Sequence, residues 1–145
     1  MLLFLIRFLL IICWLAISCF IGVLVGILRP FNPDNIRIVS LLINFGRYIL
    51  GIKIEIKNRE IMDQLRPCVF ISNHQDNLDI FPGAFSIPDK TVTIGKRSIL
   101  LIPFFGLFYW LSGNILIDRK NKKRAFHAMD EASKAIREKK ISVWV

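Results

Sequence analysis

The sequence predicts an α/β protein in which an N-terminal transmembrane helix precedes a largely parallel sheet flanked by helices. Residues 8–28 contain no charged side chain, which is typical of a membrane-spanning helix. Further along the chain, short continuous apolar runs such as residues 68–71 alternate with segments of helical periodicity. Apolar strands in alternating βα order favour a parallel sheet that is covered by helices on its faces.

The N-terminal apolar segment matches the roughly 20 residues that a helix needs to cross a bilayer. A cleaved secretory signal is the alternative, but the segment is longer than the usual apolar core of about 7 to 15 residues. No small-x-small cleavage site precedes Arg29-Pro30. We therefore expect residues 1–30 to be an uncleaved anchor. Its cytoplasmic side is predicted to be the C-terminal one, because Arg7 alone precedes the span and more basic residues follow it: Arg29, Arg37, Arg47 and Lys53.

Residues 31–51 are predicted to form an amphipathic interfacial helix, with the clearest pattern over residues 36–50. Its predicted apolar face consists of Ile38, Leu41, Leu42, Phe45 and Ile49. Its predicted polar face carries Arg37, Ser40, Asn44 and Arg47. The apolar face either covers a protein core or lies in the membrane interface beside the anchor, and the sequence leaves both possibilities open.

Residues 52–145 contain the predicted sheet. Strands are expected at residues 52–57, 68–72, 91–96, 114–119 and 141–145, with helices in the gaps. The last helix, over about residues 121–140, is predicted to turn its many charges to water. Its buried face is predicted to consist of Ala125, Met129, Ala132 and Ile136.

Residues 98–112 are apolar on almost every side and are interrupted by Pro103 and Gly106. The proline disfavours a second regular membrane span. The neighbouring Tyr109 and Trp110 suit the headgroup level of a bilayer. The segment is therefore either a buried core helix or an element that dips into the membrane or contacts acyl chains.

Composition also indicates a protein at a membrane surface. Hydrophobic residues make up 54% of the chain and the net charge is +9, so the basic surface attracts anionic lipid. Nucleic acid is not expected as a partner, because the basic residues are scattered and no nucleic-acid-binding motif occurs. Cys13 and Cys19 lie in the apolar span and Cys68 lies alone, which predicts no disulfide framework. No metal site is expected either, because no cysteines or carboxylates cluster at ligand spacing.

The predicted chemical centre is the segment Asn73-His74-Gln75-Asp76-Asn77-Leu78-Asp79. A neutral imidazole at His74 could take a proton from a hydroxyl near neutral pH, and a carboxylate at Asp79 could hold the imidazole in one tautomer. Because no protein nucleophile accompanies this pair, the substrate would supply the hydroxyl. Five positions on one helix lie about 140° apart, so the segment must turn, with a helix that starts near Asn77. The structural alternative is a loop histidine with a helix-capping aspartate.

His127, the second of the two histidines, is predicted to be an ordinary surface residue of the last helix.

Three ordered motifs resemble those of the bacterial 1-acylglycerol-3-phosphate acyltransferases, of enterobacterial type. They are the Asn73–Asp79 segment, Val92-Thr93-Ile94-Gly95-Lys96-Arg97-Ser98, and Gly113-Asn114-Ile115-Leu116-Ile117-Asp118-Arg119. The resemblance extends over most of the chain and includes the anchor. It implies acyl transfer from acyl-CoA or acyl carrier protein to the 2-hydroxyl of lysophosphatidate, which yields phosphatidate at the cytoplasmic side of the bacterial inner membrane. Residues 52–145 would then be the N-terminal part of an acyltransferase domain.

The resemblance also implies the roles of site residues. His74 would be the general base and Asp79 its orienting partner, with Asn73 beside them at the substrate. Substrate binding at the glycerol-phosphate side is implied for Lys96, Gly113, Asp118 and Arg119. A guanidinium at Arg119 can bind phosphate oxygens in a fork, and an ammonium at Lys96 can offer a point charge. A surface ion pair is the alternative for both basic residues.

Family members continue into a Phe-Pro-Glu-Gly-Thr-Arg motif, and this sequence stops before it. The resemblance therefore implies that the chain is truncated before this further family motif and is inactive by itself. Two other interpretations stay open. One is an acyltransferase that acts on another lysophospholipid or a lipid-A-type acceptor. The other is a non-catalytic, membrane-anchored remnant that only binds lipid or a partner.

Overall fold

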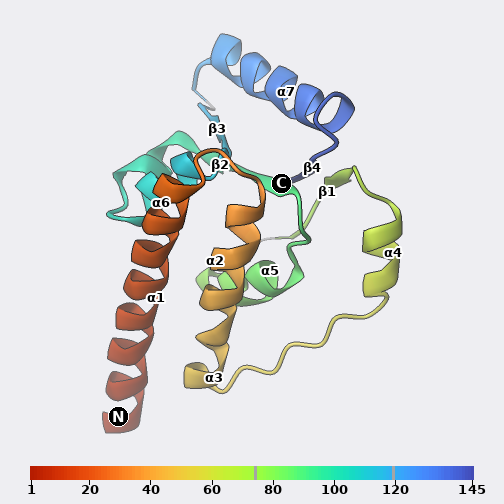
Figure 1. Cartoon of the computed structure of the whole chain (residues 1–145). Coiled ribbons are helices and arrows are strands. Elements are labelled where there is room, and N and C mark those ends of the chain that lie inside the picture. Colours follow the sequence, from red (N-terminus) through yellow and green to blue (C-terminus); the bar gives the residue numbers. More distant parts are fainter. Residues whose placement is uncertain (74, 119) are drawn as a thin grey trace.

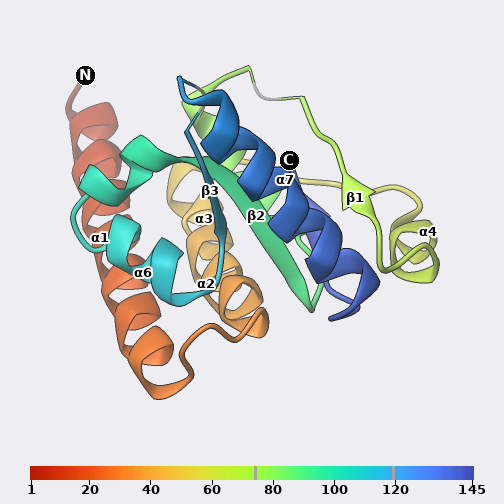
Figure 2. The ribbon, with the colours of Figure 1, turned by 90° about the horizontal axis from the view of Figure 1, so that it is seen from above.

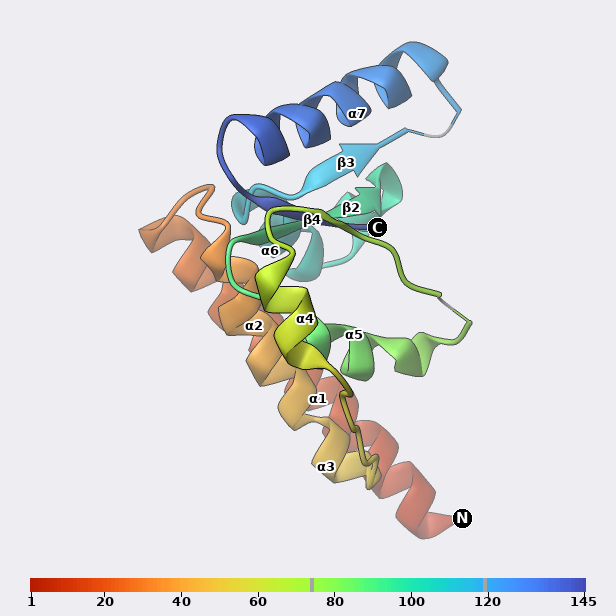
Figure 3. The same cartoon turned by 90° about the vertical axis from the view of Figure 1, so that its right-hand side faces the viewer.

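A computed structural model describes residues 1–73, 75–118 and 120–145 of the chain. Four parallel strands form one sheet in the order β1-β4-β2-β3. The strands are β1 (Val69–Phe70), β2 (Thr91–Lys96), β3 (Ile115–Ile117) and β4 (Ser142–Trp144). Helix α7 covers one face, and helices α1, α2, α5 and α6 lie on the other (Figures 1 and 3). The predicted α/β class and parallel sheet are confirmed.

Helix α1 (Leu2–Leu28) extends the predicted membrane span by six residues at its N-terminus, so that Arg7 lies inside the helix. It is the one helix in the described part of the chain with the length and composition to cross a membrane. Residues 2–10 of the helix are exposed, whereas the later turns, from Ile11 on, bury one side against the rest of the protein. The buried side includes Ser18, Cys19, Gly22, Val23 and Gly26. Small residues on this side let neighbouring helices approach closely.

The predicted helix over residues 36–50 consists of two helices, α2 (Asp34–Phe45) and α3 (Arg47–Leu50), which meet at Gly46. Ser40 and Asn44 of the predicted polar face are buried, contrary to prediction, and the predicted apolar face does not cover the core at Leu41 and Phe45. Leu41 and Phe45 are exposed, and the buried face consists of Asn35, Ile36, Val39, Ser40, Ile43 and Asn44. The helix carries two apolar stripes, and packing against α1 and α5 selected the one that contains Val39. On this face the Asn35 amide donates to Arg29 O at 2.6 Å, whereas the buried Oδ1 atoms of Asn35 and Asn44 have no hydrogen-bond partner among the described residues.

No strand forms at residues 52–57, contrary to prediction. Ile52 and Ile54 pack against the core while Lys53 and Glu55 are exposed, so the alternating pattern that predicted a strand is present. The segment makes an irregular connection to α4 (Arg59–Gln64), as seen in Figure 1. A strand needs a partner on at least one edge, and the sequence pattern alone does not specify one.

Helix α7 (Lys122–Arg137) buries Ala128, Ala132 and Ala135 against the sheet, where Val92, Ile115 and Val143 complete a small core. The predicted face is therefore wrong in part. Ala132 is buried as expected, but Met129 is exposed. Alanine side chains let the helix lie close to the sheet, which leaves the longer side chains at the flanks.

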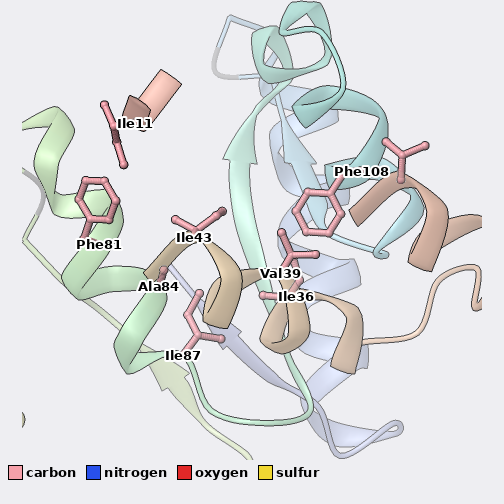
Figure 4. Close-up of a cluster of buried hydrophobic side chains, with 9 residues drawn as sticks. Ile11, Ile36, Val39, Ile43, Phe81, Ala84, Ile87 and Phe108 are labelled. Carbon is pink, nitrogen blue, oxygen red and sulfur yellow. The ribbon is translucent and has the colours of Figure 1, made fainter. Parts of the chain in front are cut away.

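A larger core lies on the opposite face of the sheet, between α1, α2, α5 (Ile80–Ser86) and α6 (Phe105–Leu111). Figure 4 shows Phe81 and Ala84 of α5 facing Ile43 of α2. Residues 98–112 form the 3-10 helix η2 (Arg97–Leu101) followed by α6, and only α6 contributes side chains to this core. The buried-helix alternative describes only one side of α6, which buries Phe108 and Tyr109 but exposes Leu107 and Trp110.

Candidate active site

Each motif that the sequence singled out follows or includes the carboxyl end of a parallel strand. The Asn73–Asp79 segment follows β1, Lys96 is the last residue of β2, and Asp118 directly follows β3. All the strands run parallel, so these ends meet at one edge of the sheet (Figure 2). Ligands of open parallel α/β sheets bind outside this edge. Since β4 lies between β1 and β2, the strand that precedes the first motif lies two strand spacings, about 10 Å, from the strand that ends at Lys96.

Two hydrogen bonds fix the start of the first motif. The Trp144 indole donates to Ser72 Oγ at 3.1 Å, and the Ser72 amide donates to Val145 O at 3.2 Å. The next residue, Asn73, is exposed at the point where the chain leaves the sheet. His74 lies outside the described residues. Pairing of His74 with Asp79 therefore stays a prediction.

Asp79 ends the 3-10 helix η1 (Asn77–Asp79), which begins where the sequence predicts a helix start. Its carboxylate Oδ2 accepts hydrogen bonds from the backbone N–H groups of Gln75 at 2.6 Å and Asp76 at 2.8 Å. The Asp76 carboxylate in turn accepts from the Leu78 N–H at 2.8 Å. These reciprocal bonds form a capping box, which turns the chain sharply after β1. The turn that the spacing required is thus confirmed, and its bonds hold the Asp79 carboxylate in place.

Lys96 and Asp118 lie together. Lys96 is in register with Ile117, the neighbour of Asp118, and both line an open cavity of about 480 Å³. The remaining lining residues include two cations that sequence reasoning missed, Arg97 and Lys120. Their only signal in the sequence is that Arg97 lies within the second motif and Lys120 directly follows the third. Three basic side chains and one carboxylate give this cavity a net positive charge, which favours an anionic ligand.

Asp118 is held by its neighbours at the entrance to α7. Its carboxylate accepts from the Lys120 backbone N–H at 3.2 Å and lies 3.4 Å from Arg124 Nη1. Arg119 lies outside the described residues. Asp118 therefore has the contacts of a residue that shapes the β3–α7 turn, beside the basic cavity.

Gly113 lies at the opposite edge of the sheet from Lys96 and Asp118, because it precedes β3 rather than following it. Its φ of +75° is in the left-handed region that favours glycine. The turn places Gly113 against the backbone of Phe31. The structure thus gives Gly113 a role in the turn from α6 to β3 and does not bring it to the basic cavity.

An apolar cavity of about 270 Å³ lies between the sheet and helices α2, α5 and α6. Its lining includes Ile80, which directly follows Asp79, and Tyr109, whose hydroxyl bonds to Thr93. Burial raises the pKa of Tyr109 to about 12, so its hydroxyl stays neutral and serves the packing of α6 on β2.

Over the described residues, no three His, Cys, Asp or Glu side chains are grouped so as to hold a metal ion. His127 is exposed on α7 with Nδ1 3.9 Å from a Glu131 carboxylate oxygen, as predicted for a surface residue. The described cysteines, Cys13, Cys19 and Cys68, are all free thiols.

Fold and site together define an α/β protein with a long apolar N-terminal helix and a basic cavity at the carboxyl edge of a parallel sheet. Comparison with known proteins gives the family. The chain belongs to the acyltransferase family, whose model matches residues 53–145.

Curated relatives align with almost the whole length of this chain. A 1-acyl-sn-glycerol-3-phosphate acyltransferase of Haemophilus influenzae is 36% identical over 140 residues, which cover 95% of this chain and 57% of the relative. The enzyme of that name from Escherichia coli is 32% identical over 145 residues, covering 99% of this chain and 58% of the relative. The alpha enzyme of that name from Mus musculus is 33% identical over 132 residues, covering 91% and 46%. The chain thus spans about half the length of these relatives. No solved structure gives a significant match.

Proposed function

We propose that the full-length protein transfers a fatty acyl group from acyl-CoA or acyl carrier protein to the 2-hydroxyl of 1-acylglycerol-3-phosphate, yielding phosphatidate. The observation that carries this proposal is the placement of motif residues from β1, β2 and β3 at one edge of the sheet. The names of the relatives, all 1-acyl-sn-glycerol-3-phosphate acyltransferases, support the same reaction.

In the proposed mechanism, His74 acts as general base. It accepts the proton of the 2-hydroxyl while that oxygen attacks the thioester carbonyl carbon. The tetrahedral intermediate collapses, the carbon–sulfur bond breaks, and the thiol leaves with the proton from the imidazolium. Asp79 would orient the imidazole and stabilise its charged form, and the backbone N–H groups of Gln75 and Asp76 hold the Asp79 carboxylate for this task.

The basic cavity is proposed to bind the phosphate of the acceptor. Lys96 would contribute a point charge and Arg119 a forked guanidinium, with Arg97 and Lys120 adding positive potential. Asn73 would contact the acceptor near His74. Asp118 would position the turn through its bonds to Lys120 and Arg124, and Gly113 would act only through the fold. The apolar cavity beside Ile80 is a suitable site for an acyl chain.

The proposed location is the bacterial inner membrane, with the catalytic edge on the cytoplasmic side. Residues 1–30 would anchor the protein in the membrane and residues 31–51 would cover the acyltransferase domain that begins near residue 52. The net charge of +9 supports attraction to an anionic lipid surface.

The test is an acyl-transfer assay with the full-length protein in membranes, with lysophosphatidate and a radiolabelled acyl-CoA as substrates. Replacement of His74 by Ala is expected to lower kcat by about 10² to 10⁴, the usual contribution of a general base. The matched control is His127→Ala, which removes the exposed histidine of α7 and should leave the rate unchanged. Unaltered turnover by the His74 variant would refute the mechanism. Equal rates with uncharged monoacylglycerol as acceptor would refute the phosphate-binding role of the cavity.

A further inference from the structure

Helices α1 and α6 together expose a continuous apolar surface. On α1 the exposed side chains include Phe20, Leu24 and Ile27, beyond the region that the protein body covers. At the start of α6 and along it the exposed side chains are Phe104, Leu107 and Trp110, which recur every three residues and carry no charge. This α1–α6 face is unlike an ordinary water-facing helix surface, which is expected to be polar.

The two halves of the α1–α6 face touch each other. The rings of Phe20 and Phe104 meet edge to face with centroids 6.0 Å apart, and beneath them a Cβ on Gly22 would lie 2.7 Å from the Phe108 ring. At the other end, the rings of Phe31 and Trp110 are 5.3 Å apart. Because the helices are this close, any lipid that reaches Phe20 also reaches the exposed side of α6.

The apolar surface continues into η2 and then meets positive charge. Leu101 is 83% exposed and Ile102 is 50% exposed at the end of η2. Exposure of these neighbouring apolar side chains to water is unfavourable. Leu101 lines the basic cavity together with Lys96, Arg97 and Lys120. Apolar side chains flanked by lysine and arginine are typical of segments that bind at the surface of anionic bilayers.

The opposite face of the sheet provides a contrast. On α7, Phe126 is 75% exposed in a helix that carries many charged residues. Figure 3 shows α7 on the other side of the sheet from α1. Exposed apolar side chains that occur singly are normal on water-facing surfaces. The α1–α6 face differs because its apolar side chains are contiguous.

We propose that η2 and the exposed side of α6 form a second contact with the bilayer, beside α1. The occupant of this surface is the acyl and headgroup region of an anionic membrane, as the continuity with α1 and the neighbouring cations indicate. Lys96 and its cavity then face the lipid headgroups. This membrane contact does not depend on acyl transfer, so it can be tested on a protein without activity.

The test measures the surroundings of single positions in the full chain, reconstituted in vesicles of phosphatidylethanolamine and phosphatidylglycerol. In a background without the three native cysteines, Leu24→Cys, Leu101→Cys, Leu107→Cys and Phe126→Cys are each labelled with an environment-sensitive fluorophore. Spin-labelled lipid is expected to quench the label at positions 24, 101 and 107 several-fold more than the label at position 126. Aqueous iodide should show the reverse order. The proposal is overturned if lipid and iodide quench the labels at positions 101 and 107 to the same extent as the label at position 126. It is equally overturned if spin-labelled lipid does not quench the label at position 24.

A second measurement avoids labels on η2 and α6. The chain has three tryptophans, so Trp14→Phe with Trp144→Phe leaves Trp110 as the only source of indole fluorescence. Brominated lipid should quench this fluorescence strongly. If iodide quenches it as fully as it quenches a free tryptophan derivative, α6 faces water and the proposal fails.

Discussion

The Tyr109 hydroxyl lies 2.7 Å from Thr93 Oγ1 and joins α6 to the central strand β2. Thr93 Oγ1 also lies 3.0 Å from the side-chain oxygen of Asn114, whose amide nitrogen donates to Tyr109 O at 2.9 Å. Thr93 Oγ1 is thus within hydrogen-bond distance of both the Tyr109 hydroxyl and the Asn114 amide oxygen, and the same amide oxygen accepts from the Thr93 backbone N–H at 2.8 Å. These three side chains form a buried polar network that fixes α6 against the strand carrying Lys96.

This network predicts a loss of stability at alkaline pH. Burial raises the pKa of Tyr109 to about 12, above the value of about 10 expected in an unfolded chain. The folded state therefore holds the proton more tightly. This tighter proton binding stabilises the folded state fully below about pH 10, and the stabilisation is lost as the pH rises toward 12. Denaturant unfolding followed across this range should show a fall on the order of 2 to 3 kcal/mol.

Tyr109→Phe should remove that pH dependence, while lowering stability near neutral pH by about 1 kcal/mol because one hydrogen bond is lost. The matched control is Tyr48→Phe, at an exposed position of α3. If the Tyr109 variant keeps the full alkaline loss, the loss comes from another group.

Close packing of α1 on α2 and α6 predicts that Gly22 tolerates no side chain. A Cβ there would lie 2.7 Å from the Phe108 ring and 2.9 Å from Val39 Cγ2. Gly22→Ala is expected to lower the free energy of unfolding by about 1 to 3 kcal/mol, through overpacking. Gly83→Ala in α5 is the control, since a Cβ there meets nothing within 4 Å. It should be neutral or stabilising by about 0.4 to 1 kcal/mol. Equal stabilities of the two variants in detergent would contradict the packing.

The two aspartates of the η1 capping box allow a structural role to be separated from a catalytic one. Asp76→Ala removes the bond to the Leu78 N–H, and Asp79→Ala removes the bonds to the Gln75 and Asp76 N–H groups. Each should cost about 0.5 to 2 kcal/mol of stability, as loss of a cap does. Only the Asp79 variant is expected to lose most of its kcat as well. Equal losses of kcat in both variants would show that Asp79 acts only as a cap.

The proposed binding of phosphate at the basic cavity predicts a change in KM for lysophosphatidate. Lys96→Ala removes one cation from the lining, and a hydrogen bond to a charged group is worth about 1.5 to 3 kcal/mol. KM should therefore rise by roughly tenfold or more, with a smaller effect on kcat. Lys139→Ala, at an exposed site beyond the end of α7, is the control and should leave KM unchanged. An unchanged KM for the Lys96 variant would place the phosphate elsewhere.

Local signals predicted much of the fold. Strand β2 has the predicted bounds of residues 91–96, because its β-branched run favours an extended chain in many surroundings. The turn before Asn77 was predictable because the capping residues Asp76 and Asp79 act within a few positions of each other. The apolar helix α1 follows from composition alone.

Long-range packing decided the features that the sequence did not predict. The stripe of α2 that contains Val39 became the buried one only because α1 and α5 lie against it, whereas Leu41 and Phe45 are equally apolar and exposed. Residues 52–57 alternate like a strand, but no strand forms because its hydrogen bonds depend on a partner.

The candidate site divides in the same way. The sequence by itself determined which residue types are present: the His74 and Asp79 pair, Lys96, and the Gly113–Arg119 motif. Only the tertiary structure decided that Lys96 and Asp118 share one cavity with Arg97 and Lys120, and that Gly113 lies at the opposite edge. The physical reason is that residue type and spacing act along the chain, whereas strand order and direction, which bring distant residues together, depend on which apolar surfaces pack.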